Sequence, residues 1–408
     1  MLSLLRGIRV LDLTTVVLGP YASQILADMG AEVTKVEPPT GDVFRSVRPG
    51  RSEKLGAGFI NTNRNKKSIA VDLQTPEGRK VLADLTRNSD VVVHNMRPVS
   101  AKKLGLDFET LKSFNHRIIY CYAAGFGQGG SNANEPAYDD TIQAASGLAY
   151  LNANAQGEPR FLPTIIADKV GGLHLAIAVL GALASEDRGK RAMCIEAPMF
   201  ESLISFLLVE QLAGKTFDPA LGGIGYDRLL SPYRKPFKTS DGFVSIIPYN
   251  GTHWARFLEL VGRDDLATDP RVLDPVKRSQ NIDMLYAVIE ESTPDRTTDE
   301  WIELLSERDI PHAKVNRVEE LFEHPHLKEV GMFSHVQHPT EGSLLSVRTP
   351  FSVSDDTASQ PDSLAPALGQ HTREVLRAIG YDKATIDELL ERDIVRSDEE
   401  TSDQEKDR

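Results

Sequence analysis

The chain has 408 residues, and its 46 Lys+Arg against 59 Asp+Glu give a formal net charge of −13. This length suits two or three domains, and a composition of 40% hydrophobic and 26% charged residues excludes a disordered or fibrous protein. Because a strongly negative field repels polyanions, we expect no binding to nucleic acid or anionic membranes. An anionic ligand would therefore need a local group of cations.

The cysteines and histidines form no pattern of disulfides or metal ligands. Cys121 and Cys194 both lie in apolar stretches, and two cysteines are too few for a disulfide framework. The longest apolar stretch, residues 170–184, is shorter than the ~18 residues of a membrane span. The apolar start at residues 1–5 is too short for a signal peptide, and Arg6 interrupts it. We predict a cytoplasmic protein with reduced thiols and no metal site.

Strands and helices alternate along the first part of the chain. Apolar and β-branched runs predict strands at residues 8–13, 31–36, 67–73, 90–94 and 117–122. Helices are predicted from residue 19 to residue 29 and from Pro76 through Leu85, the second preceded by Thr75 as a capping residue. This order predicts βαβ units and an α/β fold with an open parallel sheet.

Ligands of such sheets bind beyond the carboxyl ends of the strands. That rule selects residues 14–20, 95–98 and 125–140 as the candidate binding rim.

Further along, residues 165–215 are predicted to be largely helical, and the composition changes near residues 216–238. A strand at 243–247 and helices at 254–261 and 299–308 indicate a second, smaller α+β domain at 225–325. Residues 1–224 and 326–395 would form the large Rossmann-like domain, with a strand at 344–347 and a final helix at 372–379. Residues 396–408 contain six acids and three bases and are predicted to be a disordered tail.

One window has the opposite charge. Residues 60–105 contain nine bases and four acids, a net charge of +5. Arg64, Lys66, Arg97 and Lys103 flank predicted strand ends, which makes them candidates for phosphate binding. Arg79, Lys80 and Arg87 fit a solvated helix face.

Asp168 lies between an apolar run and an Ala-rich helical stretch. Its carboxylate fits a helix N-cap. It equally fits a nucleophile that backbone N–H groups and the helix dipole keep ionised. Gly171 and Gly172 would then let a bulky substrate approach the backbone.

Several motifs, in the same order along the chain, resemble the class III coenzyme A transferases, a family that includes formyl-CoA transferase, carnitine CoA-transferase and α-methylacyl-CoA racemase. They are residues 7–14, 19–22, 26–38, 63–69, 138–145, 167–172, 310–315 and 367–371. The resemblance extends from about residue 5 to residue 395.

The resemblance implies that Asp168 is the catalytic nucleophile. It would attack a donor acyl-CoA to form a mixed anhydride and then an aspartyl-CoA thioester, from which CoA passes to an acceptor carboxylic acid. CoA and acyl-CoA would be substrates, with no permanently bound cofactor. Residues 222–225 lie where family members carry a glycine-rich loop that excludes water.

The resemblance also implies a CoA site and an interlocked homodimer. The implied CoA contacts are Val17, Leu18, Val71, Asp72, Leu73, Gln74, Asn95, Met96, Arg97, Lys103, Tyr138 and Asp139. Pro38 stands where formyl-CoA transferase has a basic residue, and Arg97 is a candidate replacement.

Two alternatives stay open. A racemase of the same fold would need two acid/base groups, and Tyr138 is a poor base at neutral pH. A non-catalytic CoA-binding protein would have no need of Asp168. Arg228, Tyr233, Arg234 and Tyr138 offer contacts suited to a small dicarboxylate such as succinate, mesaconate or itaconate, although surface salt bridges would account equally well for the two arginines.

Overall fold

The structure, a computed structural model, describes residues 2–154, 156–354, 361 and 363–398. The chain divides into two compact units, Met1–Leu207 with Lys328–Arg408 and Leu208–Leu327. The domain boundaries predicted from composition, at residues 225 and 325, stay a prediction. Of the predicted disordered tail, Arg396 belongs to a strand instead, and residues 399–408 lie outside the described residues.

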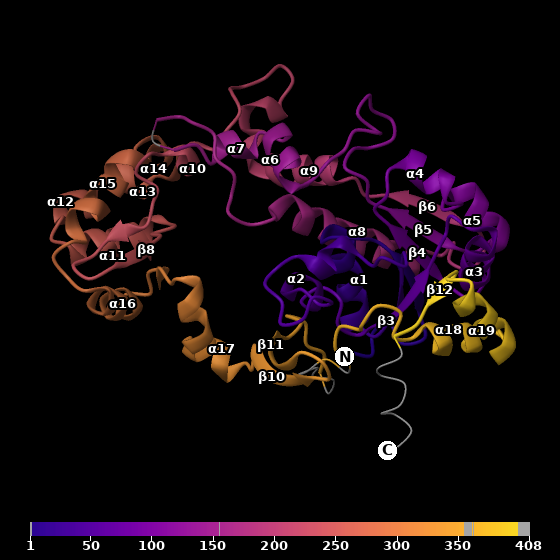
Figure 1. Ribbon diagram of the computed structural model, residues 1–408. Helices are drawn as coiled ribbons and strands as arrows, with labels where there is room; N and C mark the ends of the chain where they lie inside the picture. Colours follow the sequence, from indigo (N-terminus) through magenta and orange to yellow (C-terminus); the bar gives the residue numbers. More distant parts are fainter. Residues whose placement is uncertain (1, 155, 355–360, 362, 399–408) are drawn as a thin grey trace. The chain divides into compact units, whose positions relative to one another are not determined.

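A seven-stranded sheet organises the larger unit, with strand order β12-β3-β2-β1-β4-β5-β6 (Figure 1). Its strands are β1 (Arg9–Leu13), β2 (Glu32–Glu37), β3 (Lys66–Val71), β4 (Val91–His94), β5 (Ile119–Tyr122), β6 (Met193–Glu196) and β12 (Val395–Arg396). All neighbours pair in parallel except β12, which pairs antiparallel with β3. The predicted α/β class is confirmed, and the sheet is mixed because of this edge strand.

Helices cover both faces of the sheet. They are α1 (Leu18–Asp28), α2 (Ala57–Ile60), α3 (Pro76–Arg87), α4 (Pro98–Lys103), α5 (Phe108–Phe114), α6 (Asp139–Ala145), α7 (Leu148–Leu151), α8 (Ile166–Ala184), α9 (Met199–Gln211), α18 (Thr372–Ala378) and α19 (Lys383–Glu391), with a 3-10 turn, η1, at Val43–Ser46. One core joins the sheet to α1, α6, α8 and α9, and a second joins it to α3, α5, α18 and α19. A separate hairpin pairs β10 (Phe333–His338) with β11 (Gly342–Val347).

Helix α8 is long and apolar enough to span a membrane by length and composition alone. Half of its apolar window is buried inside the structure, against α1 and the sheet. A buried central helix of this kind accounts for the same composition without a membrane.

The smaller unit has its own core around a three-stranded antiparallel sheet. Its strands, in sheet order, are β7 (Phe237–Lys238), β8 (Phe243–Ile246) and β9 (His312–Lys314). Its helices and 3-10 turns are η2 (Ala213–Thr216), α10 (Asp227–Leu230), α11 (Gly251–Leu260), α12 (Asp264–Ala267), α13 (Pro270–Leu273), α14 (Pro275–Gln280), α15 (Ile282–Ser292), α16 (Thr298–Glu307) and η3 (Val318–Glu323). The boundary after Leu327 falls inside α17 (Pro325–Glu329). Buried Trp254, Phe257 and Trp301 form the centre of this core.

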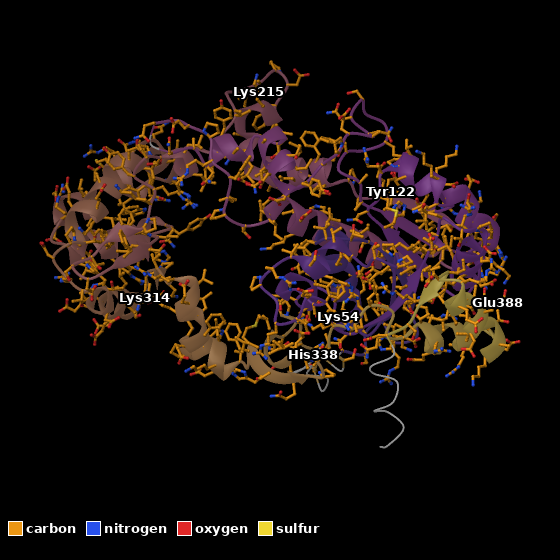
Figure 2. All side chains as sticks on the ribbon, in the orientation of Figure 1. Lys54, Tyr122, Lys215, Lys314, His338 and Glu388 are labelled. Atoms are coloured by element: carbon orange, nitrogen blue, oxygen red, sulfur yellow. The ribbon has the colours of Figure 1, made fainter. Side chains whose placement is uncertain are left out.

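Strand β6, of four residues, and strand β12, of two, are among the elements that were not predicted. The predicted final helix corresponds to α18, but α19 follows it and carries Glu388 (Figure 2).

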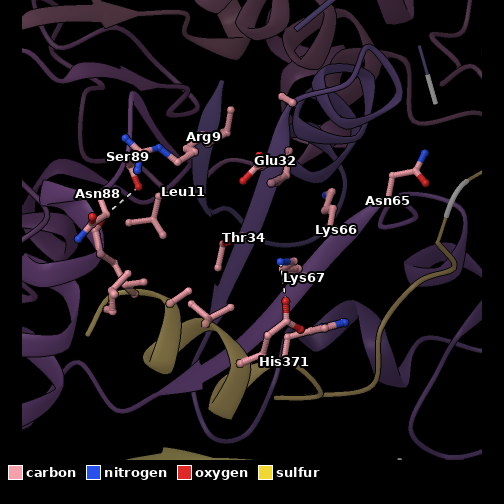
Figure 3. A pocket seen from close by; sticks show the side chains of 18 of the residues that line it. Arg9, Leu11, Glu32, Thr34, Asn65, Lys66, Lys67, Asn88, Ser89 and His371 are labelled. Carbon is pink, nitrogen blue, oxygen red and sulfur yellow. Dashed lines mark hydrogen bonds and ion pairs between the residues drawn. The ribbon is translucent and has the colours of Figure 1, made fainter. Parts of the chain in front are cut away.

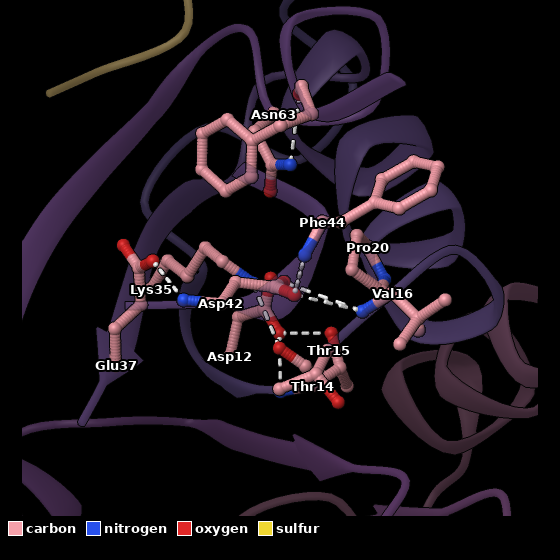
Figure 4. Close-up of polar contacts among 12 residues, drawn as sticks. Asp12, Thr14, Thr15, Val16, Pro20, Lys35, Glu37, Asp42, Phe44 and Asn63 are labelled. Atoms are coloured by element: carbon pink, nitrogen blue, oxygen red, sulfur yellow. Dashed lines mark hydrogen bonds and ion pairs between the residues drawn. The ribbon is translucent and has the colours of Figure 1, made fainter. Parts of the chain in front are cut away.

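Six buried charged side chains form an ion cluster next to β1, and Figure 4 labels four of them, Asp12, Lys35, Glu37 and Asp42. The members are the cations Lys35, Arg45 and Lys66 and the carboxylates Asp12, Glu37 and Asp42. The Nζ atoms of Lys66 and Lys35 lie 3.1 Å from Asp12 and Asp42, and Arg45 donates to both oxygens of Glu37 at 2.7 Å. Three positive charges thus meet three negative ones inside the fold.

Burial disfavours the charged form of each of these groups, whereas the neighbouring opposite charges favour it. Burial alone would raise the pKa of Asp12, but Lys66 and Lys35 hold it well below its usual range. Burial, together with the charge of Lys35, lowers the pKa of Lys66 to about 8, although Asp12 acts in the other direction. For Lys35, burial again opposes the charge, but Asp12, Asp42 and Glu37 raise its pKa.

The predicted phosphate roles of Lys66 and Arg64 are wrong. Lys66 begins β3, at the amino edge of the sheet, and its Nζ donates to Asp12, to the Pro20 carbonyl and to Asn63. Arg64 donates to both oxygens of Asp28 and to a backbone carbonyl. Both side chains are thus already hydrogen-bonded to acceptors within the protein.

Replacing Lys66 with Met is expected to destabilise the protein by about 3–5 kcal/mol, because Asp12 would keep an uncompensated buried charge. Urea unfolding at neutral pH measures the loss. The matched control is Lys67→Met on the same strand, where the half-exposed Lys67 pairs with Glu374 and is worth less than about 1 kcal/mol. Equal losses for the two variants would contradict a special role for the ion cluster.

Candidate active site

The candidate site begins where the strand order reverses, between β1 and β4. The order 3-2-1-4-5-6 is that of the Rossmann fold, whose ligands bind outside the carboxyl ends of the strands at this switch point. There Asn95, directly after β4, accepts a hydrogen bond from the Thr15 backbone N–H at 3.0 Å and donates to the Thr15 carbonyl at 2.9 Å. The pair of bonds ties two segments of the predicted rim together.

The ion cluster shapes the loop after β1. Val16 has a φ of 68°, which is a strained conformation for a β-branched residue. Its N–H donates to Asp42 at 3.1 Å, and Asp42 is itself paired with Lys35. Sequence reasoning missed Asp42 and Lys35, since nothing in the pattern distinguishes them from solvent-exposed charges. This strained loop leads into the predicted contact residues Val17 and Leu18, both of which are buried.

Helix α8 packs closely against α1 through two glycines. A Cβ atom at Gly171 would lie 2.7 Å from the Leu18 side chain, and one at Gly172 would lie 2.6 Å from the Leu18 carbonyl oxygen. The prediction that these glycines make room for substrate is therefore wrong, because α1 occupies that space. The contact joins Leu18 to the first turns of α8, where Asp168 lies.

Asp168 does not cap its helix. It lies inside the first turn of α8, and Asp139 supplies the cap from a distant part of the chain. The buried Asp139 accepts from the backbone N–H of Ala167 at 2.6 Å and of Asp168 at 3.1 Å, and its other oxygen accepts from Gln143 at 2.6 Å. Asp139 thus holds the backbone of Asp168 and leaves the Asp168 side chain available.

The carboxylate of Asp168 has an unusual environment. No ion pair or hydrogen bond to its oxygens occurs among the described residues. Burial, together with the neighbouring charge of Asp139, raises the pKa of Asp168 to about 7. A partly buried carboxyl group with a shifted pKa and no bonded partner is typical of a reactive group.

The other predicted contact residues divide into two groups. Met96 is partly buried, Arg97 and Lys103 are exposed at the two ends of α4, and Tyr138, before α6, is 69% exposed. Val71 ends β3, and Asp72, Leu73 and Gln74 follow it, at the same carboxyl edge of the sheet but separated from β1 by β2. Because Val71 and Leu73 are buried in the core, a ligand could meet only their backbone.

A cavity lies elsewhere in this unit. It has a volume of about 510 Å³ and is lined by the starts of β1 to β3, the end of α3 and α18 (Figure 3). Its rim carries the ion pair of Lys67 and Glu374, and its floor includes Leu11 and Thr34. It opens at the amino edge of the sheet, whereas Asp168 lies near the carboxyl edge, so it is distinct from the candidate site.

Among the described residues, no group of three or more His, Cys, Asp or Glu side chains could hold a metal ion.

Comparison with known proteins decides the family, since a model of CoA-transferase family III matches residues 5–372. The chain belongs to CoA-transferase family III. It is 31% identical to the succinyl-CoA:glutarate CoA-transferase of Mus musculus over 95% of this chain and 89% of that protein. It is also 31% identical to the succinyl-CoA:mesaconate CoA-transferase of Haloarcula marismortui over 93% and 98%.

A solved structure agrees with this assignment. The crystal structure of a CaiB/BaiF family protein from Brucella suis matches with a TM-score of 0.76 and 30% identity, over 93% of this chain and 100% of that one. The predicted family is confirmed, and the protein is a class III CoA-transferase enzyme, a member of a family whose substrates are acyl-CoA thioesters.

Replacing Asp168 with Asn is expected to stabilise the enzyme, increasingly so as the pH rises from about 4 to above 7. A carboxyl whose pKa is raised by folding favours the native state while it is protonated, and that contribution is lost as the pH passes the folded pKa of about 7. Since Asp168 is partly exposed, we expect a gain of about 1–2 kcal/mol at pH 8.

Thermal or urea unfolding of both proteins between pH 4 and pH 8.5 measures this difference. Asp140→Asn, at the exposed neighbour of Asp139, is the control and should show no comparable pH-dependent gain. A constant difference between Asp168→Asn and the native protein across this range would argue against the raised pKa.

Proposed function

We propose that the enzyme transfers CoA from a donor acyl-CoA to an acceptor carboxylic acid, with Asp168 as the nucleophile. The observation that carries this proposal is the carboxylate of Asp168, partly buried and without a bonded partner among the described residues, while Asp139 takes over the capping of α8. A desolvated and unpaired carboxylate is a better nucleophile than a hydrated or ion-paired one.

The reaction would run through four substitutions. An Asp168 oxygen attacks the donor thioester carbonyl, and the CoA thiolate leaves behind a mixed anhydride. The thiolate then attacks the aspartyl carbonyl of this anhydride, which gives an Asp168–CoA thioester and releases the donor acid. The acceptor carboxylate displaces the thiolate to form a second anhydride, and the thiolate attacks its acyl carbonyl. The products are a new acyl-CoA and the free Asp168 carboxylate, so the energy of the thioester is kept.

The candidate contacts for CoA are the cations at the carboxyl edge of the sheet. Neither Arg97 nor Lys103 has an ion pair within the part of the chain that the structure describes, and both are exposed. Arg97 makes one long hydrogen bond to the Asn134 carbonyl, at 3.3 Å. Free guanidinium and ammonium groups here support binding of the CoA phosphates.

For the acids, we propose small dicarboxylates, because the relatives named above act on succinyl-CoA with glutarate or mesaconate.

We also propose a homodimer. It would cover the apolar side chains that α8 and α9 leave exposed on the larger unit, such as Leu173, Ile177 and Phe206. A cytoplasmic location stays a prediction.

Incubation with succinyl-CoA and hydroxylamine is expected to form a hydroxamate at residue 168, because hydroxylamine attacks both the anhydride and the thioester of Asp168. Peptide mass spectrometry locates the adduct. Asp168→Asn should form none and should lose transfer by about 10⁴-fold or more, whereas Asp140→Asn should keep both. An adduct at another carboxylate, or transfer retained by Asp168→Asn, would overturn the assignment of the nucleophile.

Arg97→Gln and Lys103→Gln are each expected to raise the KM for acyl-CoA by about 10-fold, with kcat nearly unchanged, because each removes a charged donor to phosphate. Steady-state kinetics at low salt measure the change. Arg79→Gln, an exposed arginine on α3 in the same basic window, is the control and should leave the KM unaltered. If all three variants behave alike, the phosphates bind elsewhere.

A further inference from the structure

A second pocket of the larger unit is lined by arginines. It has a volume of about 150 Å³, and its lining contains Arg9, Arg87, Arg117 and Arg188 with a single acid, Asp90. Arg9 also lines the cavity of Figure 3, so the two spaces adjoin. Arg9 begins β1 and Arg117 precedes β5, which places this arginine pocket at the amino edge of the sheet, opposite the candidate active site.

The four arginines come from four separate segments. Arg9 lies on β1 and Arg87 ends α3. Arg117 lies before β5, and Arg188 lies in the turn after α8. Against the one carboxylate of Asp90, four guanidinium groups leave a net charge of 4 − 1 = +3 in the lining. Like charges gathered in one concave space repel one another, and an anion in the pocket would offset this repulsion.

Two of these arginines already have partners within the fold. Asp90 accepts a hydrogen bond from the Arg9 backbone N–H at 2.9 Å, and its Oδ2 atom lies 3.7 Å from the Arg9 Nε atom. Arg87 pairs with Asp84, and its guanidinium lies 5.5 Å from the centroid of the Phe114 ring. The charges of Arg9 and Arg87 are thus partly compensated without a ligand.

The other two arginines are without partners. Neither Arg117 nor Arg188 forms an ion pair or a hydrogen bond through its guanidinium among the described residues. Asp187, the neighbour of Arg188 in the sequence, pairs with Arg191 instead, at 2.6 Å. Two guanidinium groups that line the same pocket therefore keep all their N–H donors for water or a ligand.

The backbone that carries Arg117 is fixed in place. The Asn115 side chain accepts a hydrogen bond from the Arg117 backbone N–H at 3.0 Å, and its amide donates to the Ser89 carbonyl at 2.9 Å. These bonds join the segment before β5 to the segment before β4, where Asp90 lies. A site whose backbone is already held loses less entropy when a ligand binds.

The position of these arginines near helix ends accounts for only one of them. A helix C-terminus attracts cations, and Arg87 at the end of α3 fits that explanation. The attraction is confined to the last turn, whereas Arg188 lies four residues beyond the end of α8. Arg117 belongs to no helix. The helix dipoles therefore leave the convergence of the two unpaired arginines unexplained.

The size and lining of the pocket indicate the kind of anion. A volume of about 150 Å³ equals the liquid volume of roughly five water molecules, which admits a small oxyanion or a single phosphate group but no nucleotide. Ile119 is the only large apolar residue in the lining, so an alkyl chain would find little surface. A planar carboxylate presents both oxygens to one guanidinium, whereas a tetrahedral phosphate can accept from guanidinium groups on several sides.

We propose that the arginine pocket binds phosphate, as the free ion or as the phosphate group of a small phosphomonoester. Arg117 and Arg188 supply the principal donors, and Arg9 and Arg87 add positive charge. A phosphomonoester carries a charge of about −1.5 to −2 at neutral pH, which offsets most of the +3 of the lining. The site is separate from the proposed CoA contacts and takes no part in the transfer reaction, so its test does not depend on that function.

Calorimetric titration of the full-length protein with inorganic phosphate, at neutral pH and in about 0.1 M salt, tests the proposal. Arg117→Gln and Arg188→Gln should each weaken phosphate binding by about 10-fold, because each removes a charge-assisted hydrogen bond. Both side chains are exposed, so both variants are expected to fold. The matched control is Lys190→Gln, which removes the same charge close to Arg188 but outside the lining, and it should change the affinity by less than about twofold.

A second control separates this pocket from the CoA contacts. Arg97→Gln, at the opposite edge of the sheet, should bind phosphate in the arginine pocket as the native protein does. Titration with methyl phosphate then identifies the source of the phosphate group. An affinity equal to that of inorganic phosphate indicates a phosphomonoester, much weaker binding indicates the free ion, and either result supports phosphate as the ligand.

Equal phosphate affinity in the native protein, Arg117→Gln and Arg188→Gln would overturn the proposal, as would a loss of the same size in Lys190→Gln. Absence of phosphate binding to the native protein at millimolar concentrations would overturn it too. Binding that is lost in Arg97→Gln and kept in Arg117→Gln would place the phosphate at the CoA contacts instead. If acetate binds as tightly as phosphate, the pocket is a general anion site and the assignment to phosphate fails.

Discussion

The ion cluster beside β1 is the constraint on which the candidate site depends. Three cations and three carboxylates are buried together, and removal of any one would leave a charge without compensation. The cluster also holds the neighbouring backbone, since Asp42 both pairs with Lys35 and accepts a hydrogen bond from the N–H of Val16. That bond stabilises a backbone conformation that a valine rarely adopts. The pairing of buried charges thus determines the path of the loop after β1.

The loop then determines where Asp168 lies. It leads directly into α1, and the Leu18 backbone and side chain fit against Gly171 and Gly172 of α8. Side chains larger than hydrogen at those two positions would push the helices apart, and Asp168 is one turn away. Asp139 completes the arrangement by holding the backbone N–H of Asp168. The position of Asp168 therefore follows from a series of contacts that begins at the ion pair of Lys35 and Asp42.

The elements of this arrangement that depend on local pattern can be predicted from the sequence. The apolar run of β4 and the cap and proline of α3 predict those elements because their cause lies within a few residues. The burial of Lys35 and Glu37 has no such local cause. Both share a strand face with Ala31 and Val33, where the alternation predicts apolar side chains, and their partners come from the segment after β2, Asp42 for Lys35 and Arg45 for Glu37. The cap on α8 comes from Asp139, 29 residues before Asp168, so the pattern around Asp168 suggests a cap that the fold does not need.

In the basic window at residues 60–105, too, the tertiary partners of each cation decide its role. Of its nine cations, five have carboxylate partners in the described structure, namely Arg64, Lys66, Lys67, Lys80 and Arg87. The remaining four are Arg79, Arg97, Lys102 and Lys103, and the last three lie on or next to α4, beyond the carboxyl end of β4. A cation that already has a carboxylate partner gains little from an anionic ligand, whereas one without a partner gains the whole interaction. The places where this protein can hold an anion are therefore set less by how many cations a segment contains than by which of them the fold leaves without a partner.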